Sequence, residues 1–593
     1  MVLANWTLLN SGTVKEAYIL LLTLNGCGLL TLLLARDVEH KTGKIARGLL
    51  SLILFALIST PVWFTFLDNL AKSWTVYDAG AVLQQRPSLF LGIFDDIFYR
   101  HLSAQTPRVL PSTNFLVLAG ILWLCASRSK LDGRHLSWGL GVTSVTALLF
   151  VFGIVPPSMI LRLPFINRIY HIDNTFSCVA IVCLLLLAGF GVKAFCRDLE
   201  TGNFRQSYAT VLVTAAALLA FYFAVAPSAQ SEDRQSRFFW FYSTLLATAI
   251  AITPLIGARL FRKTGPMLWP VVLLAAIFIA TTWRHSMHLD KPSGPDVMNP
   301  QSRTDLFARS SATLKLIGER GPGEPFRTVG LKYNFFPGYG GAMALEQIDG
   351  PDPLLNKHYR ALMDTSGVAL PFGSAKEGEV DEPLADYLPL FDMLNVRYVL
   401  GSPAGKSALA PSLRKIAGLD LNVYESTSAW PRAFFTNHIA SYGAENEFVA
   451  LLKAGDGAPF AALAQPDLDR EEALSRWAGS SSRPAPRTVR ATDYALTTNT
   501  TSFKINAPGP GVIVLTEPYI DGDFQVRVNG RLEHYFRINS AFRGLFVSAG
   551  GEYTVSFSYW PRNFTMCLWI SALALIVLAL WLGIGFRRTA TSV

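Results

Sequence analysis

The stretch that decides the fold reads FTMCLWISALALIVLALWLGIGF (Phe564–Phe586), and it carries no charged residue. About 20 apolar residues in a helix cross the roughly 30 Å hydrocarbon core of a bilayer. Eight further apolar stretches lie upstream, all before residue 284. The sequence therefore predicts about nine spans, near Ala17–Leu34, Gly48–Leu67, Asn114–Ala126, Leu136–Val155, Thr175–Phe195, Tyr208–Ala226, Phe239–Gly257, Pro266–Trp283 and Phe564–Phe586.

Composition supports a polytopic α-helical membrane protein. Of the 593 residues, 51% are hydrophobic and 16% charged, whereas a soluble domain carries about 25% charged residues. The formal net charge is +9. The basic residues sit largely at the ends of the predicted spans, where anionic lipid headgroups attract them. Because no basic stripe with interleaved aromatic residues occurs, we do not expect nucleic-acid binding.

Orientation follows from the loops between the spans, since basic residues are retained on the cytoplasmic side. One alternate set of short loops, with the tail, holds 15 Lys and Arg residues, against 9 in the longer opposite loops. We therefore expect a protein of the cytoplasmic (inner) membrane. The N-terminus and the large domain between residues 284 and 562 are predicted to be extracytoplasmic, and the C-terminal tail cytoplasmic.

The predicted external domain must fold without disulfide bonds, because all six cysteines lie in spans or at their ends. Neither a CxxC motif nor a His/Cys cluster at zinc spacing occurs, so no structural zinc site is predicted. Changes in pattern divide the chain into 1–283 (membrane domain, about eight helices), 284–440 (α+β subdomain), 441–487 (helical and linker region), 488–562 (antiparallel β-sandwich) and 563–593 (last span and tail).

The sandwich is predicted from a period of two. Segments such as FKINA, GVIVLTEPY and YTVSFSYW alternate or are rich in β-branched and aromatic residues. Between such segments lie the turn pairs Asp521-Gly522, Asn529-Gly530 and Gly550-Gly551, which are typical of β-hairpins.

Four stretches together resemble the YfhO-type bacterial membrane proteins, a branch of the GT-C class of glycosyltransferases that use polyprenyl-phosphate sugars. The resemblance covers most of the chain. It is carried by DMLNVRYVL (Asp392–Leu400), YESTSAWPRAFFTN (Tyr424–Asn437), the stretch from VLTEPYIDGDF to VSFSYWP (Val514–Pro561) and, more weakly, RIYHIDNTFSCVAIVCLLLLAGFG (Arg168–Gly191).

The resemblance implies transfer of a sugar from a polyprenyl-phosphate donor to an envelope glycan on the outer face of the membrane. Family members are usually longer, with further upstream spans and an acidic residue in the first outer loop. The chain is thus read as a short variant, as half of a split enzyme working with another membrane subunit, or as a derivative that has lost catalysis. The alternative function is a non-catalytic accessory or glycan-binding protein of polysaccharide assembly.

Glycosyl transfer from a lipid phosphate needs a carboxylate to accept the acceptor's proton and cations around the departing phosphate. The best predicted source is the outer loop 69–112. Its segment FLGIFDDIFYRH (Phe90–His101) has apolar residues at helical spacing and predicts an amphipathic surface helix. Asp95 and Asp96 are the candidate catalytic bases, with Arg100 and His101 as substrate-binding residues. The competing interpretation is a solvated face with an Asp96–Arg100 ion pair.

The second candidate loop is PPSMILRLPFINRIYHID (Pro156–Asp173). Arg162, Arg168 and His171 could bind phosphate oxygens, for which the bidentate guanidinium is suited. An interfacial anchor that meets lipid phosphates in general is an equally good interpretation. Asp173 stands at the start of the next span, where an ionisable group is either functional or simply tolerated. The sequence leaves open whether a divalent cation takes part.

Overall fold

The computed structural model describes residues 1–75, 81–94, 113–126, 134–201, 312–331, 345–348, 354–368, 384–401, 411–480 and 485–590, with short gaps at 12–13, 36–37, 114, 164–165 and 321–322, and the single positions 209 and 213. The chain forms two compact units. Unit 1 comprises residues 1–59, 77–292 and 574–593, and unit 2 comprises residues 60–76 and 293–573.

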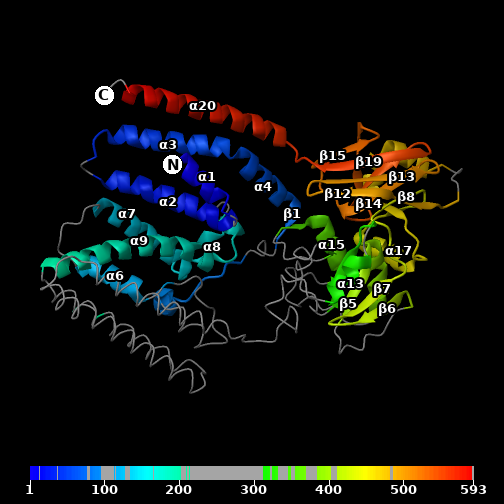
Figure 1. Cartoon of the computed structure of the whole chain (residues 1–593), viewed down its shortest axis with the longest axis horizontal. Coiled ribbons are helices and arrows are strands. Elements are labelled where there is room, and N and C mark those ends of the chain that lie inside the picture. The colour runs from blue at the N-terminus through cyan, green and yellow to red at the C-terminus, as the bar shows by residue number, and fades with distance from the viewer. Residues whose placement is uncertain are drawn as a thin grey trace, which may run out of the picture. The chain divides into compact units, whose positions relative to one another are not determined.

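Unit 1 is helical. Its described helices are α1 (Val2–Leu9), α2 (Val14–Leu34), α3 (Lys41–Ile58), α6 (Phe115–Ala126), α7 (Arg134–Val151), the short α8 (Pro157–Ile160) and α9 (Ile172–Thr201), with 3-10 turns η2 (Pro87–Phe94) and η3 (Ile166–Arg168). Helix α9 packs against both α6 and α7 (Figure 1). Glycine allows the α6–α9 contact to be close: a Cβ on Gly120 would stand 2.8 Å from Ala188. Small residues at such contacts are typical of helices packed within membranes.

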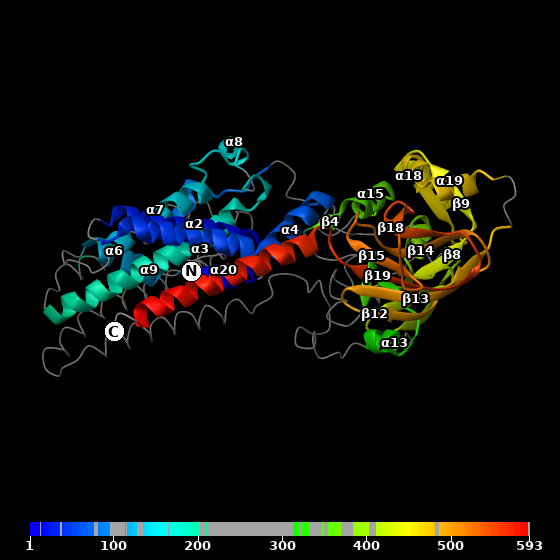
Figure 2. The same cartoon turned by 90° about the horizontal axis from the view of Figure 1, so that it is seen from above.

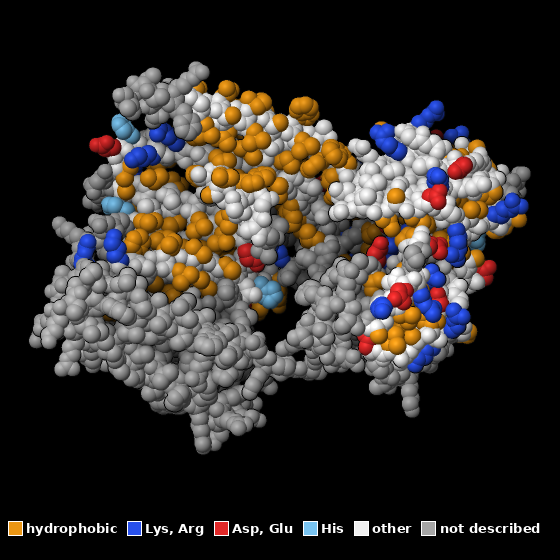
Figure 3. All heavy atoms as spheres, viewed as in Figure 1, with side chains coloured by type: hydrophobic (Ala, Val, Ile, Leu, Met, Phe, Trp, Pro, Cys, Tyr) orange, Lys and Arg blue, Asp and Glu red, His pale blue; other side chains and the backbone are white. Residues whose placement is uncertain are grey.

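Three described helices are long and apolar enough to cross a membrane, at Lys15–Leu34, Ile172–Phe195 and Phe564–Ile584, the last within α20 (Phe564–Ala590). Their outer faces carry exposed apolar side chains, such as Leu33 on α2 and Leu580 on α20, as Figure 3 shows for the visible face of the helices. Helix α6 and α7 are shorter apolar helices at the third and fourth predicted spans. The spans predicted between residues 208 and 283 lie outside the described residues.

The second predicted span, Gly48–Leu67, is not one straight helix. It is divided between α3 and α4 (Thr60–Lys72), which meet at a bend of 61°. Pro61 explains the break, because proline has no N–H to donate and disfavours helical geometry in the residue before it. Helix α4 belongs to unit 2, where it continues into β1 (Ser73–Trp74), paired antiparallel with β4 (Leu355–Asn356).

The first part of unit 2 contains a five-stranded mixed sheet in the order β3-β2-β5-β7-β6. Its strands are β2 (Arg327–Gly330), β3 (Glu346–Gln347), β5 (Val396–Gly401), β6 (Leu413–Gly418) and β7 (Asn422–Ser426). Strand β2 is parallel to β3 and β5, whereas β7 is antiparallel to β5 and β6. The accompanying helices are α13 (Ala312–Arg320), α15 (Lys357–Thr365), the 3-10 turn η6 (Leu384–Asp386) and α16 (Leu388–Met393).

A helical connection follows the mixed sheet. Strands β9 (Ile439–Tyr442) and β10 (Ala461–Ala464) pair in parallel, with α17 (Glu445–Ala454) between them in sequence. Helices α18 (Gln465–Arg470) and α19 (Glu472–Ala478) come next.

Two five-stranded antiparallel sheets then form the sandwich (Figure 2). One sheet has the order β11-β8-β14-β18-β17, with β8 (Ala433–Thr436), β11 (Thr488–Arg490), β14 (Gly511–Pro518), β17 (Phe536–Ile538) and β18 (Phe542–Val547). The other has the order β12-β13-β19-β15-β16, with β12 (Thr492–Leu496), β13 (Thr500–Ala507), β15 (Phe524–Val528), β16 (Arg531–Glu533) and β19 (Gly551–Tyr559). The predicted antiparallel sheets are confirmed.

Strand β14 reads as a continuous apolar run because both of its faces are buried. Ile513 and Leu515 pack between the two sheets of the sandwich, whereas Val512 and Val514 join the core that extends to the mixed sheet. Strand β13 instead alternates between buried and more exposed residues. The first sheet is therefore the middle layer of unit 2, and the second is an outer layer.

Candidate functional site

The candidate site in unit 1 lies where the two predicted outer loops meet at the N-terminal end of α9. Leu83 forms an isolated parallel bridge with His171. The backbone N–H of Leu83 donates to the carbonyl of Tyr170 over 2.7 Å, and that of Asp173 donates to the carbonyl of Leu83 over 3.1 Å. Residues 83–85 and 170–173 are thus tied together, although they are far apart in sequence.

Asp173 is the buried carboxylate of this junction, with a side chain only 5% exposed. The side-chain amide of Gln85 donates to its Oδ2 over 2.5 Å. Asp173 also lies in the first turn of α9, where the partial positive charge of the helix end favours an anion. Its neighbours Ile172 and Phe176 belong to the apolar core of unit 1, so this polar contact lies beside that core.

His171 brings an imidazole to the same carboxylate. Its Nδ1 lies 3.7 Å from Oδ1 of Asp173, too far for a hydrogen bond, and its side chain is 44% exposed. A water or hydroxyl-bearing ligand can reach the exposed part of the ring. The carboxylate and imidazole together are groups that can accept or pass on a proton.

The neighbouring Gln84 fixes the position of the loop. Its side-chain amide donates to the carbonyls of Phe150 and Val155, over 2.8 and 2.9 Å. The backbone N–H of Gln85 donates to the carbonyl of Val151, the last residue of α7. The bonds to Phe150 and Val151 satisfy carbonyls that the end of a helix leaves without intrahelical partners.

The structure describes three of the seven predicted site residues, at different places in unit 1. His171 lies at the junction, and Arg162 is exposed in the turn after α8. Arg168 ends η3, and its side chain lies outside the description. Asp95, Asp96, Arg100 and His101 all lie outside the described residues.

The described part of Phe90–His101 differs from the predicted amphipathic α-helix. Residues up to Phe94 form the end of the 3-10 turn η2, and Ile93 and Phe94 are buried in the core. In this described part, Ile93 and Phe94 thus pack against protein, whereas Phe90 is exposed. Sequence reasoning also missed Gln84 and Gln85, whose only signal was a pair of amides, QQ, in a predicted membrane-proximal loop.

No metal centre is found in the part of the chain that the structure describes, since no three His, Cys, Asp or Glu side chains come together there in a way that could hold an ion. The site at α9 offers one carboxylate and one imidazole.

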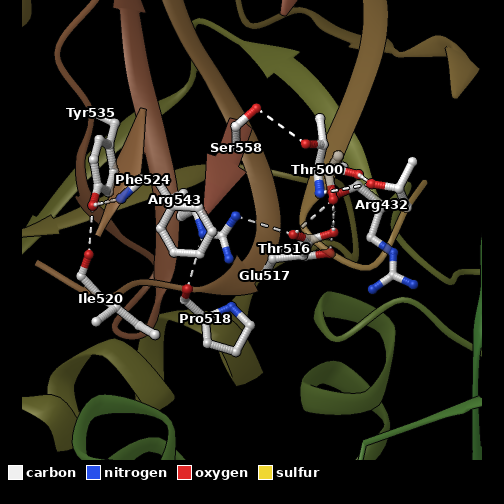
Figure 4. A network of polar contacts seen from close by, with 12 residues as sticks. Arg432, Thr500, Thr516, Glu517, Pro518, Ile520, Phe524, Tyr535, Arg543 and Ser558 are labelled. Atoms are coloured by element: carbon white, nitrogen blue, oxygen red, sulfur yellow. Dashed lines mark hydrogen bonds and ion pairs between the residues drawn. The ribbon is translucent and has the colours of Figure 1, made fainter. Parts of the chain in front are cut away.

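A second polar cluster lies inside the sandwich of unit 2 (Figure 4). Arg543 is 6% exposed, and its Nη1 lies 3.2 Å from Oε2 of Glu517. Its Nε donates to the carbonyl of Pro518, and its guanidinium carbon lies 3.4 Å from the ring centre of Phe524. Burial lowers the pKa of Arg543 to about 10, against the opposing effect of Glu517. Each group is matched by a partner, so this cluster is structural.

No protein-family description matches this chain. A search of curated proteins also finds no match. Among solved structures, the chain is similar to the arabinofuranosyltransferase AftD from Mycobacteria, with a TM-score of 0.35 and 11% identity. The alignment covers 94% of this chain and 45% of that protein, so the chain spans less than half of its length. A likeness of this size assigns no activity, and the functional argument rests on the residues themselves.

Proposed function

We propose that the chain is a glycosyltransferase-like protein of the cytoplasmic membrane, related to the YfhO-type branch of the GT-C class. It transfers a sugar from a polyprenyl-phosphate carrier to an envelope glycan on the outer face. The observation that carries this proposal is the junction at α9, because it joins the two loops in which the acidic and basic candidates lie.

The chemistry divides between the two loops. Asp95 or Asp96 is the base that takes the proton of the acceptor hydroxyl. Basic residues neutralise the carrier's phosphate as the glycosyl bond breaks. They are Arg100 and His101 from the first loop, and Arg162, Arg168 and His171 from the second. Asp173 is a positioning residue, since its contacts with Leu83 and Gln85 hold the second loop against the first.

This scheme does not require the protein to transport the phosphate-linked sugar, because the carrier's headgroup is reached from the outer interface. The proposal therefore places residues 284–562 and the N-terminal end of α9 in the same extracytoplasmic compartment. Exposed apolar side chains on α2 and α20 support a membrane location.

Transfer is tested in proteoliposomes supplied with a panel of labelled polyprenyl-phosphate sugars and envelope glycan. The double variant D95N/D96N should abolish transfer, because an amide cannot accept the proton. D173N should retain it, since an amide oxygen can still accept the bond from Gln85. D469N is the matched control, on an exposed turn of α18. Activity lost in D173N and kept in D95N/D96N would reassign the base to Asp173.

Sidedness has its own test, because residues 284–562 contain no cysteine. A cysteine introduced by D456C, at an exposed position, should react with an impermeant maleimide in intact cells. One introduced by R587C in the tail should react only after permeabilisation. The opposite pattern would refute the outer-face mechanism. Correct sidedness with no transfer from any donor would favour the accessory, glycan-binding function instead.

A further inference from the structure

Two buried arginines of unit 2 face a single carboxylate. Arg432 precedes β8 and is 1% exposed, and Arg327 begins β2 and is also buried. Nη2 of Arg432 contacts Oε2 of Glu346 in a short ion pair, and Nε of Arg327 lies 3.8 Å from the same oxygen. The Glu346 side chain is 50% exposed. The carboxylate therefore stands between the buried guanidinium groups and solvent.

The two arginines differ in how well they are satisfied. Arg327 donates to the carbonyls of Leu394 and Thr516, over 2.8 and 2.7 Å, so it holds two segments of backbone together. Arg432 has Glu346 as its side-chain partner, and its Nε is enclosed without an acceptor. In Figure 4 the guanidinium of Arg432 points away from Thr516 and Glu517. A guanidinium with five N–H donors is thus left with unused capacity.

Charge is also out of balance among the residues that the structure describes here. Two guanidinium groups share one carboxylate, and the nearby Glu517 already pairs with Arg543 and accepts from Thr501. Burial, and next the charge of Arg432, lower the pKa of Arg327 to about 10. Arg327 therefore stays charged at neutral pH, and among the described residues the two guanidinium groups have one carboxylate between them. Buried charges are normally paired.

We propose that Arg432 and Arg327 form a binding site for an oxyanion, with Glu346 as its gate. A phosphate or carboxylate group from solvent takes the place of the Glu346 carboxylate and accepts from Nη2 of Arg432. Arginine suits such a ligand because its planar fork matches two oxygens at once. The ligand class is an acidic polymer or an anionic headgroup. The site is separate from the transfer chemistry proposed for unit 1.

The test is thermal unfolding of the detergent-solubilised full chain, with and without inorganic phosphate, at ionic strength matched with NaCl. E346Q removes the competing carboxylate, so phosphate should stabilise it more than it stabilises the natural chain. The expected rise in melting temperature is about 3 °C at a phosphate concentration ten times the dissociation constant. Adding R432Q to E346Q should abolish the rise.

E517Q is the matched control, because it also deprives a buried arginine of its carboxylate, but at a place where Glu517 is itself largely buried. Phosphate should not rescue it. An equal response of E346Q and E517Q would overturn the proposal, as would an E346Q chain that stays unfolded at every phosphate concentration. In the latter case the Glu346 carboxylate is needed for folding and does not control access to a binding site. Glucuronate and phosphatidylglycerol vesicles, against phosphatidylcholine, then distinguish a polymer carboxylate from a lipid headgroup as the source.

Discussion

Replacing Glu517 by glutamine should destabilise unit 2 by about 3 kcal/mol. Arg543 and Glu517 are 6% and 16% exposed and 3.2 Å apart. At an effective dielectric constant of about 20, that separation corresponds to roughly 5 kcal/mol of attraction. Glutamine keeps the shape and one acceptor oxygen, which recovers about 1.5 kcal/mol. The loss of stability cannot be much larger than this, because Arg543 could give up its proton instead of staying charged without a partner. With a pKa of about 10, deprotonation at pH 7 costs about 4 kcal/mol.

Pulse proteolysis across a urea series measures this loss in the full chain. With a urea dependence of about 2 to 3 kcal/mol per molar, the midpoint should fall by about 1 M. The control is E533Q on the exposed strand β16, which should leave the midpoint in place. A fall of less than about 0.3 M in E517Q would refute the reasoning. It would mean that the Pro518 carbonyl and the Phe524 ring, and not the carboxylate, compensate the charge.

Three further predictions concern unit 2. G511A should cost about 2 to 3 kcal/mol in the same assay, because the new Cβ would stand 2.6 Å from a phenylalanine ring of β8, whereas G509A meets nothing within 4 Å and should be neutral. The next prediction concerns Glu425. Burial by itself would raise the pKa of Glu425, but hydrogen bonds from two arginines hold it below its usual value. Its stabilisation is therefore complete above an unfolded pKa of about 4.3 and lost as pH falls through the lower folded value. E425Q should abolish this acid dependence in melting temperatures measured from pH 7 to 2, and an unchanged slope would contradict it. K72M should lower stability to urea by about 2 kcal/mol, since it leaves a buried Asp523 carboxylate 2.7 Å away without its cation. K357M, which removes one exposed bond to a carbonyl, should change little, and equal effects of the two variants would argue against a special role for the Lys72 pair.

The strands of the sandwich were predictable because their signals are local. Strand β13 alternates between buried and more exposed residues. The Asn529-Gly530 pair adopts φ values of 49° and 81° between β15 and β16, as a tight hairpin requires. The long span at α20 was equally predictable, because its apolar run alone is long enough to cross the hydrocarbon core of a bilayer.

The sequence did not predict which strands and loops pair when they are far apart along the chain. Strand β8 looks like an ordinary apolar strand of the preceding subdomain, yet it pairs with β14 and β11 of the sandwich. The contact between Gln85 and Asp173 likewise joins residues 88 positions apart. Such contacts depend on how helices and sheets pack, and a single sequence carries no periodic signal for them. The described part of Phe90–His101 shows that a local pattern can also be ambiguous, since its apolar spacing fits a surface helix and a packed 3-10 turn equally well.

The pairing of α4 and β1 with the rest of unit 2 has a consequence for synthesis. Lys72 lies 451 positions before Asp523. The strand next to it, β1, can pair only after residues 355 and 356 have been synthesised. At 5 to 20 residues per second, a ribosome needs about 20 to 90 s to supply the missing carboxylate. Throughout that interval Lys72 has only Asp68 of its two carboxylate partners, and the edge of β1 stays unpaired until residues 355 and 356 have been made. Membrane insertion of the early helices and completion of the hydrophilic unit are therefore separate events in time, and a nascent chain arrested before residue 523 should leave Lys72 open to amine-reactive reagents.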